Sequence, residues 1–491
     1  MYIYTKMSDL VSAQTVMVGA SEVNVPTEHQ YKSSVKTDVS YYTYRKLTPL
    51  TEPTLALNGT CISEFEITPS QVFNLSKSFL EADISFLAPA AGIRNVAHTG
   101  FCAMIDQIEF LDASGKQLVW IQNTQYYTKV VWPPSISQAD YLSNSIPGTS
   151  ATEAGSLGIK TTLLNRSNVA PTATNGGGVN TDVNAVFDNG VPNLIESYTG
   201  VQHGIVGAIA TALFVRLQIP LSQFYGTLFS CNKDLYFGQT TTIRITWNQS
   251  IKMGYTIVDA TSTVANLTLS PTITQNRIRL AQQANPISAE SIKQDVNTKG
   301  IDLCVPFVWT FKYVLPGAAA GGVTQSFLRK INKNHGQRLL RVWTAQFNSQ
   351  ADSGLAAGGF YANYCNNENF ANDCFSEVWS QLDSNNLQES NLINANGEVY
   401  EFIQQKIDGS AGASMGQYLS SAYMLNDFTP WKTIDFAKSD TEISGVSLSE
   451  EREYAINFKA NQIGTEGSNL FYMFVVCQRV LSITKLGTMF A

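Results

Sequence analysis

The chain has 491 residues, of which 14% are charged, and a formal net charge of −7 at pH 7. That length leaves room for two or three domains, each able to bury a core of its own. The charge argues against a protein that neutralises nucleic acid by direct contact, because phosphate binding needs clustered Lys and Arg. Aromatic residues make up 11% of the chain, and this composition with so few charges is typical of all-β sandwiches.

Residues 1–55 are predicted to form an N-terminal arm. They combine Tyr, Ser, Thr and Val with few sustained alternations, and residues 41–46 (YYTYRK) are an aromatic and basic cluster. This cluster could contact a neighbouring subunit or a membrane surface. The alternative is a strand that packs on its own domain. No basic segment precedes an apolar run at the amino terminus, so no secretion signal is expected.

Residues 56–252 are predicted to be the first of two β units. Leu80–Phe86 (LEADISF) alternates apolar and polar side chains, as a half-buried strand does. Residues 104–111 lead into Asp112-Ala113-Ser114-Gly115, and residues 116–121 follow. Asp and Gly at the two ends of a four-residue connection favour a tight turn, which predicts a β-hairpin.

Residues 141–205 differ in kind from the rest of this unit. They are rich in Ala, Thr, Ser and Asn, include Asn175-Gly176-Gly177-Gly178, and offer little to bury. A structureless loop of that length is unusual inside a compact domain, so a long surface loop is predicted. Alternation resumes at residues 213–219.

A connection at residues 253–300 is predicted to lead to the second unit, residues 301–491. Residues 256–274 are strand-like and residues 288–296 are compatible with a short helical turn. The second unit begins its alternation at Pro306 and continues through residue 315.

One helix is predicted within the second unit, at residues 375–382. Phe375, Val378, Trp379 and Leu382 are spaced at i, i+3, i+4 and i+7, with capping residues before them. The closing run, residues 470–477 (LFYMFVVC), is apolar on both faces. It is therefore predicted to be a central strand that is covered on both sides.

The two units repeat one pattern. Residues 80–86 have a counterpart in residues 340–347, and the order of later segments also recurs. The further pairs are residues 219–221 with 428–431 and residues 243–247 with 454–458. A duplicated all-β chain of this size indicates a building block rather than a catalyst.

Cysteine and histidine give no sign of a disulfide framework or a metal site. The cysteines are odd in number, scattered and without a CxxC pair, so buried thiols in a reducing compartment are expected; they are Cys61, Cys102, Cys231, Cys304, Cys365, Cys374 and Cys477. The histidines are isolated and match no metal-binding spacing; they are His29, His98, His203 and His335.

Other motifs also favour structural explanations. Residues 412–416 fit G-x-S-x-G around Ser414, but no clear buried strand precedes this loop and no His follows His335. The glycines of residues 317–322 lack the Lys-Ser/Thr of a P-loop. Residues 450–453 (EERE) read as a solvated turn before a strand, and the N-x-S/T matches at Asn58, Asn74, Asn165, Asn248 and Asn266 as chance. No catalytic, cofactor-binding or metal-binding residue is therefore assigned, and no cofactor is expected.

Two segments resemble one viral protein family. Residues 105–127 (IDQIEFLDASGKQLVWIQNTQYY) are similar to a strand-turn-strand followed by a short helix in that family. Residues 219–247 are similar to a segment in which a proline-bearing turn and an NK step, here Asn232-Lys233, precede a long strand. The usual Pro after the NK-Leu step is absent, because Asp234-Leu235-Tyr236 stands there, and the subfamily stays open. With two β units in place, the chain resembles the double jelly-roll major capsid proteins over about residues 56–491. The lineage includes adenovirus, tailless membrane-containing bacteriophages, nucleocytoplasmic large DNA viruses, virophages and polinton-like viruses.

The resemblance implies two tandem eight-stranded jelly rolls with long loops and a few short helices. It implies a non-enzymatic major capsid protein whose homotrimers are pseudo-hexagonal capsomers that tile an icosahedral shell. Interfaces inside such a block are expected to be apolar and larger than ~2,000 Å² per pair. Expected partners are neighbouring capsomers, penton and minor or cement proteins, and an internal membrane contacted through the arm. No sequence-specific nucleic-acid binding is expected, and the protein is expected in the virion, assembled inside the host cell.

Two alternatives stay open from the sequence. One is a glycan- or receptor-binding β-sandwich of a spike or appendage. The other is a carbohydrate-active β-sandwich enzyme, because the spacing of a carboxylate pair is a three-dimensional property that no sequence pattern reveals.

Overall fold

The structure is a computed structural model of the chain. The described residues all belong to one compact unit, Tyr41–Ala491. They are residues 41–51, 55–56, 61–86, 93–96, 105–124, 126–128, 131, 205–206, 213–247, 255–257, 272–315, 324–348, 375–387, 392–393, 432–437, 443–460 and 469–490.

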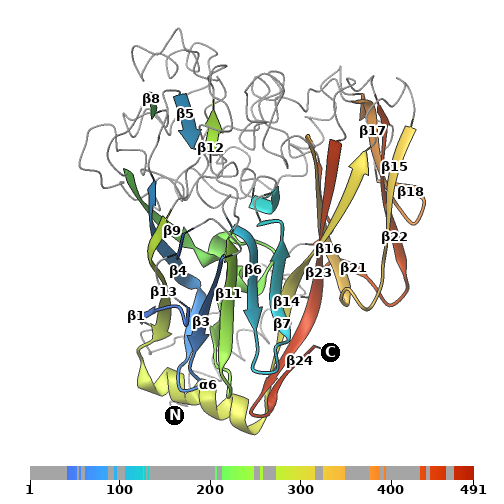
Figure 1. The fold of residues 1–491 in the computed structure, drawn as a ribbon. Helices are drawn as coiled ribbons and strands as arrows, with labels where there is room; N and C mark the ends of the chain where they lie inside the picture. Colours follow the sequence, from blue (N-terminus) through green and yellow to red (C-terminus); the bar gives the residue numbers. More distant parts are fainter. Residues whose placement is uncertain are drawn as a thin grey trace, which may run out of the picture. The chain divides into compact units, whose positions relative to one another are not determined.

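The first half of this unit contains two antiparallel sheets of a β-sandwich (Figure 1). Their strands are β1 Tyr42–Leu47, β2 Leu55–Ala56, β3 Cys61–Ile67, β4 Phe73–Phe86, β6 Ile105–Leu111, β7 Gln117–Gln122, β9 Leu213–Pro220, β10 Asp234–Leu235, β11 Thr241–Trp247 and β13 Thr272–Gln283. One sheet has the order β1-β13-β4-β10, with β9 also paired to β4 and β2 to β13. The other has the order β3-β11-β6-β7. A separate small sheet, in the order β12-β5-β8, consists of β5 Ile93–Val96, β8 Ile205–Val206 and β12 Tyr255–Ile257.

The second half repeats this plan. Its strands are β14 Ile301–Leu315, β15 Thr324–Ile331, β16 Arg338–Asn348, β17 Phe375–Leu382, β18 Asn385–Asn386, β19 Leu392–Ile393, β20 Lys432–Asp435, β21 Val446–Ser447, β22 Arg452–Ala460, β23 Asn469–Thr484 and β24 Gly487–Phe490. One sheet has the order β14-β23-β16-β20, with β21 on β16 and β24 on β23. The other has the order β15-β22-β17-β18, with β19 on β17.

The two halves have the same topology. In chain order and in pairing, β1, β13, β4 and β9 correspond to β14, β23, β16 and β20, and β3, β11, β6 and β7 correspond to β15, β22, β17 and β18. Eight strands in two facing sheets make each half a jelly roll. The predicted fold class, an all-β chain of two tandem eight-stranded jelly rolls, is therefore confirmed.

Two of the three predicted counterparts occupy equivalent strands. Residues 80–86 lie in β4 and residues 340–347 in β16, while residues 243–247 and 454–458 lie in β11 and β22. In the third pair, residues 428–431 lie outside the described residues. The predicted hairpin is β6 and β7, which are paired across the turn that begins at Asp112.

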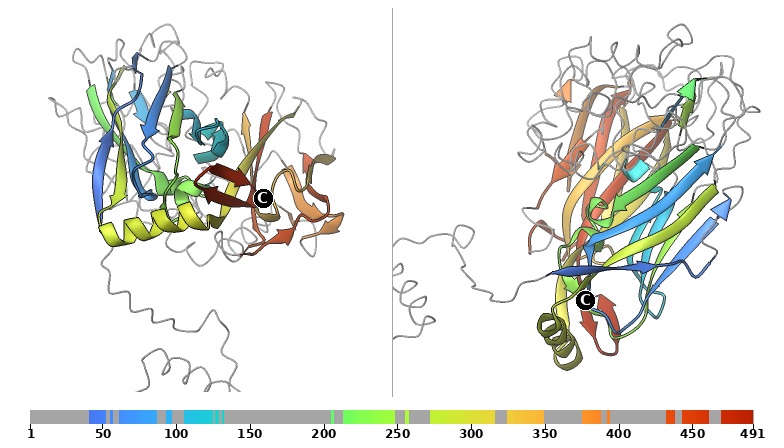
Figure 2. Two further views of the ribbon diagram at one scale, coloured as in Figure 1. Left: turned by 90° about the horizontal axis from the view of Figure 1, so that it is seen from below. Right: turned by 90° about the vertical axis from the view of Figure 1, so that its left-hand side faces the viewer.

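Strand pairing extends the first sheet at both ends of the range 56–252. β1 lies in the predicted arm and β13 in the predicted connection, and they pair with each other over six residues. The helical turn predicted at residues 288–296 lies within a 13-residue helix, α6 Pro286–Thr298, which runs along one end of this unit (Figure 2). Asn285 caps it by accepting a hydrogen bond from the Ile287 backbone N–H (3.0 Å), and Pro286 occupies its first position.

The helix predicted at residues 375–382 is wrong, because this segment is the strand β17. Val378 and Ser380 are both buried while their neighbours are half-exposed, which is the alternation of a strand. The four apolar side chains have helical spacing, with two at odd and two at even positions, so pairing with β22 overrides the apolar period of this segment.

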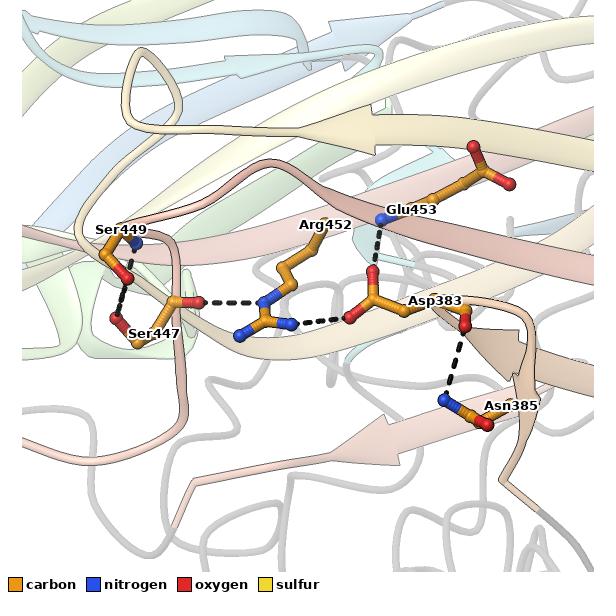
Figure 3. A network of polar contacts seen from close by, with 6 residues as sticks. All are labelled: Asp383, Asn385, Ser447, Ser449, Arg452 and Glu453. Carbon is orange, nitrogen blue, oxygen red and sulfur yellow. Dashed lines mark hydrogen bonds and ion pairs between the residues drawn. The ribbon is translucent and has the colours of Figure 1, made fainter.

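The turn from β17 to β18 contains two non-glycine residues with positive φ, Asp383 (52°) and Ser384 (65°). A two-residue hairpin of type I′ needs positive φ at both positions. The Asp383 carboxylate accepts hydrogen bonds from the Glu453 backbone N–H (2.9 Å) and the Arg452 guanidinium (2.7 Å), as Figure 3 shows. The turn is thereby fixed to the beginning of β22.

Replacing Ser384 with glycine is expected to stabilise the protein, by about 0.5–1 kcal/mol, because Gly adopts positive φ without steric cost. Chemical denaturation of the purified protein measures this difference. Asp383→Gly is the matched control, since it relieves the same backbone strain but removes the carboxylate that holds Arg452 and Glu453. The expectation fails if Ser384→Gly is as destabilising as Asp383→Gly.

Candidate assembly surfaces

The central strand of the second jelly roll, β23, contributes to two hydrophobic cores. Phe471, Met473 and Val475 lie in the core of the second jelly roll. The alternating residues Tyr472, Phe474 and Val476 lie in a core shared with the first jelly roll. All of them are fully buried. The prediction of a central strand covered on both faces is confirmed, and the covering element on one face is the other half of the chain.

Two tyrosines of the first jelly roll cover this second face. Residues 124 and 126–128 are helical, directly after β7. Tyr126 stacks on Tyr472 with ring centroids 4.5 Å apart and an interplanar angle of 21°. Tyr127 meets Phe474 edge-on at 5.3 Å and Trp343 of β16 at 6.0 Å. Such aromatic pairs add to the free energy of burial through their geometry.

A glycine turn completes the cover. It lies between two short 3₁₀ helices, η5 Leu221–Gln223 and η6 Leu228–Ser230. Gly226 has a φ of +68°, and a Cβ there would lie 3.2 Å from the Val476 side chain and 3.3 Å from the Trp343 ring. The backbone approaches the sheet this closely because no side chain intervenes. The result is a dry, close-packed contact between the two jelly rolls.

The C-terminal strand β24 makes a second contact between the halves. The Thr488 hydroxyl donates to the Asp112 carboxylate in the β6–β7 turn. The Phe490 ring has the Lys116 ammonium 5.0 Å and the Arg479 guanidinium 3.8 Å from its centroid. Burial acts to raise the pKa of Asp112, but hydrogen bonds from Thr488, Ser114 and Lys116 outweigh it and hold that pKa below its usual value.

The NK segment of the resemblance leads into a polar cluster around Asp234. Its carboxylate accepts hydrogen bonds from the Tyr42 hydroxyl (2.8 Å), the Asn74 amide (3.0 Å) and the Gln283 amide (3.0 Å). These partners come from β1, β4 and β13, so one side chain ties three strands together. Asp234 is thus a structural hydrogen-bond acceptor within its own sheet. Asn74 is buried, so its N-x-S/T match is not an exposed sugar acceptor.

The predicted contact cluster at residues 41–46 forms most of β1. This agrees with the alternative of a strand that packs on its own domain, because β1 pairs with β13 and the Lys77 ammonium lies 4.1 Å above the Tyr42 ring. Tyr41 and Tyr44 are nevertheless 54% and 51% exposed. Within the described residues β1 has no second strand partner.

His335 lies in a turn against the aromatic row of β14. Its ring is 5.1 Å from that of Trp309, whose indole N–H donates to the His335 carbonyl at 2.9 Å. Burial, followed by the nearby Arg329 guanidinium, lowers the pKa of His335. These neighbours give the imidazole a packing role.

Most of the other sequence candidates lie outside the described residues. These are the Ser414 motif, the glycines of residues 317–322, residues 141–204 of the predicted loop 141–205, residues 1–40, His29, His98, His203, Cys102, Cys365, Cys374 and the other four N-x-S/T matches. In the described part of the chain, no three His, Cys, Asp or Glu side chains are placed to hold a metal ion. The described cysteines Cys61, Cys231, Cys304 and Cys477 form no disulfide. None of the helices described here has the length and apolarity needed to cross a bilayer.

The acidic segment at residues 450–453 precedes and enters β22. Glu450 and Glu451 are exposed, and Glu451 pairs with Lys330 at 3.1 Å between two solvated side chains. Such pairs contribute little to stability. The interpretation as a solvated turn before a strand is confirmed for Glu450 and Glu451, whereas Arg452 and Glu453 are half-buried residues of β22 itself.

The interface residues that decide the geometry were not singled out from the sequence. Tyr126 and Tyr127 end the 105–127 segment, and Gly226 lies in the 219–247 segment. Two adjacent tyrosines after an amphipathic strand were the available signal, but their partners lie more than 200 residues further along the chain.

Removing the Tyr472 ring is expected to lower the free energy of unfolding by about 3–5 kcal/mol, because it leaves a cavity between the two jelly rolls. Urea denaturation of Tyr472→Ala measures this loss. Tyr41→Ala is the control, and its effect should stay within about 0.5 kcal/mol, as for an exposed side chain. Equal effects of the two changes would contradict the interface described here.

The lowered pKa of His335 predicts a step in stability below about pH 6.5. There the unfolded chain takes up the proton before the folded chain does, so the free energy of unfolding falls as the pH decreases toward the folded pKa. Thermal unfolding across pH 7 to 5 should show this loss in the wild type and not in His335→Gln. The Asp112→Asn variant should still show this step, because the loss of stability caused by protonation of Asp112 occurs below the usual Asp pKa of 3.8.

No protein-family model matches the sequence, and no curated protein is similar to it. Among solved structures, a chain from a quasi-atomic model of the PBCV-1 virus capsid is 9% identical with a TM-score of 0.51, covering 94% of this chain and 99% of that one. PBCV-1 VP54, solved as a crystal structure and fitted into a reconstruction of the virophage Sputnik, is 9% identical with a TM-score of 0.50 over the same shares. A chain of the Sputnik virophage structure solved by cryo-EM is 10% identical with a TM-score of 0.51, covering 96% and 93%. Along nearly its whole length, the chain has the fold of these viral capsid chains.

Proposed function

We propose that the chain is a viral major capsid protein without enzymatic activity, located in the virion. The observation that carries this proposal is the pair of topologically identical jelly rolls, joined by the buried contact of Tyr126 and Tyr127 with β23 and β16. The likeness in fold to capsid chains supports the same function.

The finer proposal is a homotrimer. Two jelly rolls per chain become six around a three-fold axis, and such a block presents a pseudo-hexagonal outline that packs on a flat facet. Repeated contacts of this head-to-tail kind close into a ring when the rotation between neighbours fits. Partners of the trimer are neighbouring capsomers, and we extend the proposal to penton and minor proteins and to an internal membrane contacted through the arm. Assembly takes place inside the host cell.

We also propose a domain organisation that follows the strand pairing. The first jelly roll extends from β1 to β13, α6 is the connection, and the second jelly roll extends from β14 to β24. The predicted boundaries 1–55, 56–252, 253–300 and 301–491 are modified accordingly.

The mass of the purified protein tests the proposal directly. Light scattering behind a sizing column should give one species of three times 53.8 kDa that persists on dilution. Negative-stain images should then show particles of hexagonal outline. A stable monomer would contradict the capsomer, and binding to a glycan array by that monomer would instead support a glycan-binding appendage.

A further inference from the structure

Tyr126 and Tyr127 of the first jelly roll cover one sheet face of the second jelly roll. The first jelly roll has an equivalent sheet face of its own. In the second jelly roll, the face of β14, β23 and β16 directed away from its core is buried by residues 124–128 and 221–230. By the equivalence of the halves, the corresponding face of the first jelly roll consists of β1, β13 and β4.

The side chains of this face follow from the register. Leu47 and its partner Ile278 are in the core, so the alternating residues Tyr44 and Lys46 of β1 point the other way. Tyr44 lies beside Phe79 of β4, with ring centroids 6.0 Å apart. The face therefore carries an aromatic pair bordered by a cation.

Further along the face lies an ion-pair cluster. Glu81 of β4 accepts a hydrogen bond from Arg277 at 2.6 Å and forms an ion pair with Arg279 at 2.7 Å, and both arginines belong to β13. Two cations around one carboxylate, next to Lys46, leave this region with a net positive charge. Arg279 keeps 39% of its side chain exposed and Tyr44 is 51% exposed. In the right-hand view of Figure 2, the strands of this sheet face the viewer.

The segment that covers the equivalent face also has a counterpart. Gly226, which touches Val476 and Trp343, lies in the connection between β9 and β10. In the second jelly roll the corresponding connection joins β20 to β21, because β21 pairs with β16 as β10 pairs with β4. Ile443, in this second connection, is 74% exposed.

We propose that Ile443 of one copy packs on the Tyr44–Phe79 face of a second copy. This inference rests on the proposed trimeric function and assigns its contact surfaces. Inside each copy, the first jelly roll covers a sheet face of the second. Between copies, the second jelly roll of one copy covers the equivalent sheet face on the first jelly roll of the next copy. Three such contacts alternate with three internal ones around the ring, which is how a heterologous interface closes.

A charge placed at Ile443 tests the surface. Ile443→Lys brings a cation against Lys46 and Arg279, and it should raise the concentration at which half of the trimer dissociates by at least about tenfold. Leu486→Lys is the matched control, because Leu486 is an 88% exposed side chain in the turn between β23 and β24. It should leave that concentration unchanged. Light scattering over a dilution series gives the readout, and thermal unfolding verifies that both variants fold.

A second measurement does not depend on weakening the interface. The double variant Tyr44→Cys/Ile443→Cys, treated with a short bismaleimide, should give covalent species of up to three chains on a denaturing gel. Each single variant provides the background from native thiols such as Cys61 and Cys304.

The outcomes separate this inference from the proposed function. A wild-type monomer contradicts the trimeric capsomer and this contact with it. If the wild type is a trimer, a different result contradicts only the assigned surfaces. In that result the Ile443→Lys trimer is as stable as the Leu486→Lys trimer, and the double variant gives no cross-linked product above background. Weakened trimers together with three-chain products support them.

Discussion

The structure depends on one sheet that must be buried on both faces. In β23, successive side chains alternate between the core of the second jelly roll and the core shared with the first. Neither face of the central part of this sheet is polar. The second jelly roll therefore exposes a large apolar surface unless the first jelly roll covers it. The two halves therefore depend on each other for folding and are not two independent domains joined by a linker.

The two contacts between the halves fix their relation in different ways. The stack of Tyr126 on Tyr472 and the close approach of Gly226 are apolar and depend on shape. The contact of β24 with the Asp112 turn is polar and depends on direction, since the Thr488 hydroxyl meets the Asp112 carboxylate and the Lys116 ammonium meets the Phe490 ring. A dense apolar interface resists sliding, and the directional contacts at a separate place resist rotation about it.

Periodicity along the chain predicted much of the fold. The hairpin of β6 and β7, the onset of alternation in β14 and the doubly buried β23 all follow from patterns within about ten residues. The same reasoning gave the wrong structure for residues 375–382, where four apolar side chains follow the helical period and pairing with the neighbouring strand β22 overrides it. Asp234 shows the other limit. Its three partners, Tyr42, Asn74 and Gln283, are brought together by pairing of distant strands, and no local pattern marks a carboxylate as their acceptor.

The position of β23 in the sheet has a consequence for how the chain can fold during synthesis. β14 and β16 are both made before β23, yet neither pairs with the other, because β23 lies between them. Until residues 469–484 emerge from the ribosome, both strands have open edges, and the aromatic surface of Tyr126 and Tyr127 has no sheet to cover. Open edges and uncovered apolar surface are what nascent chains aggregate through. A chain of this design is therefore most dependent on chaperones in the interval before its last long strand is complete, and truncation within β23 should be far more harmful in the cell than loss of a surface strand.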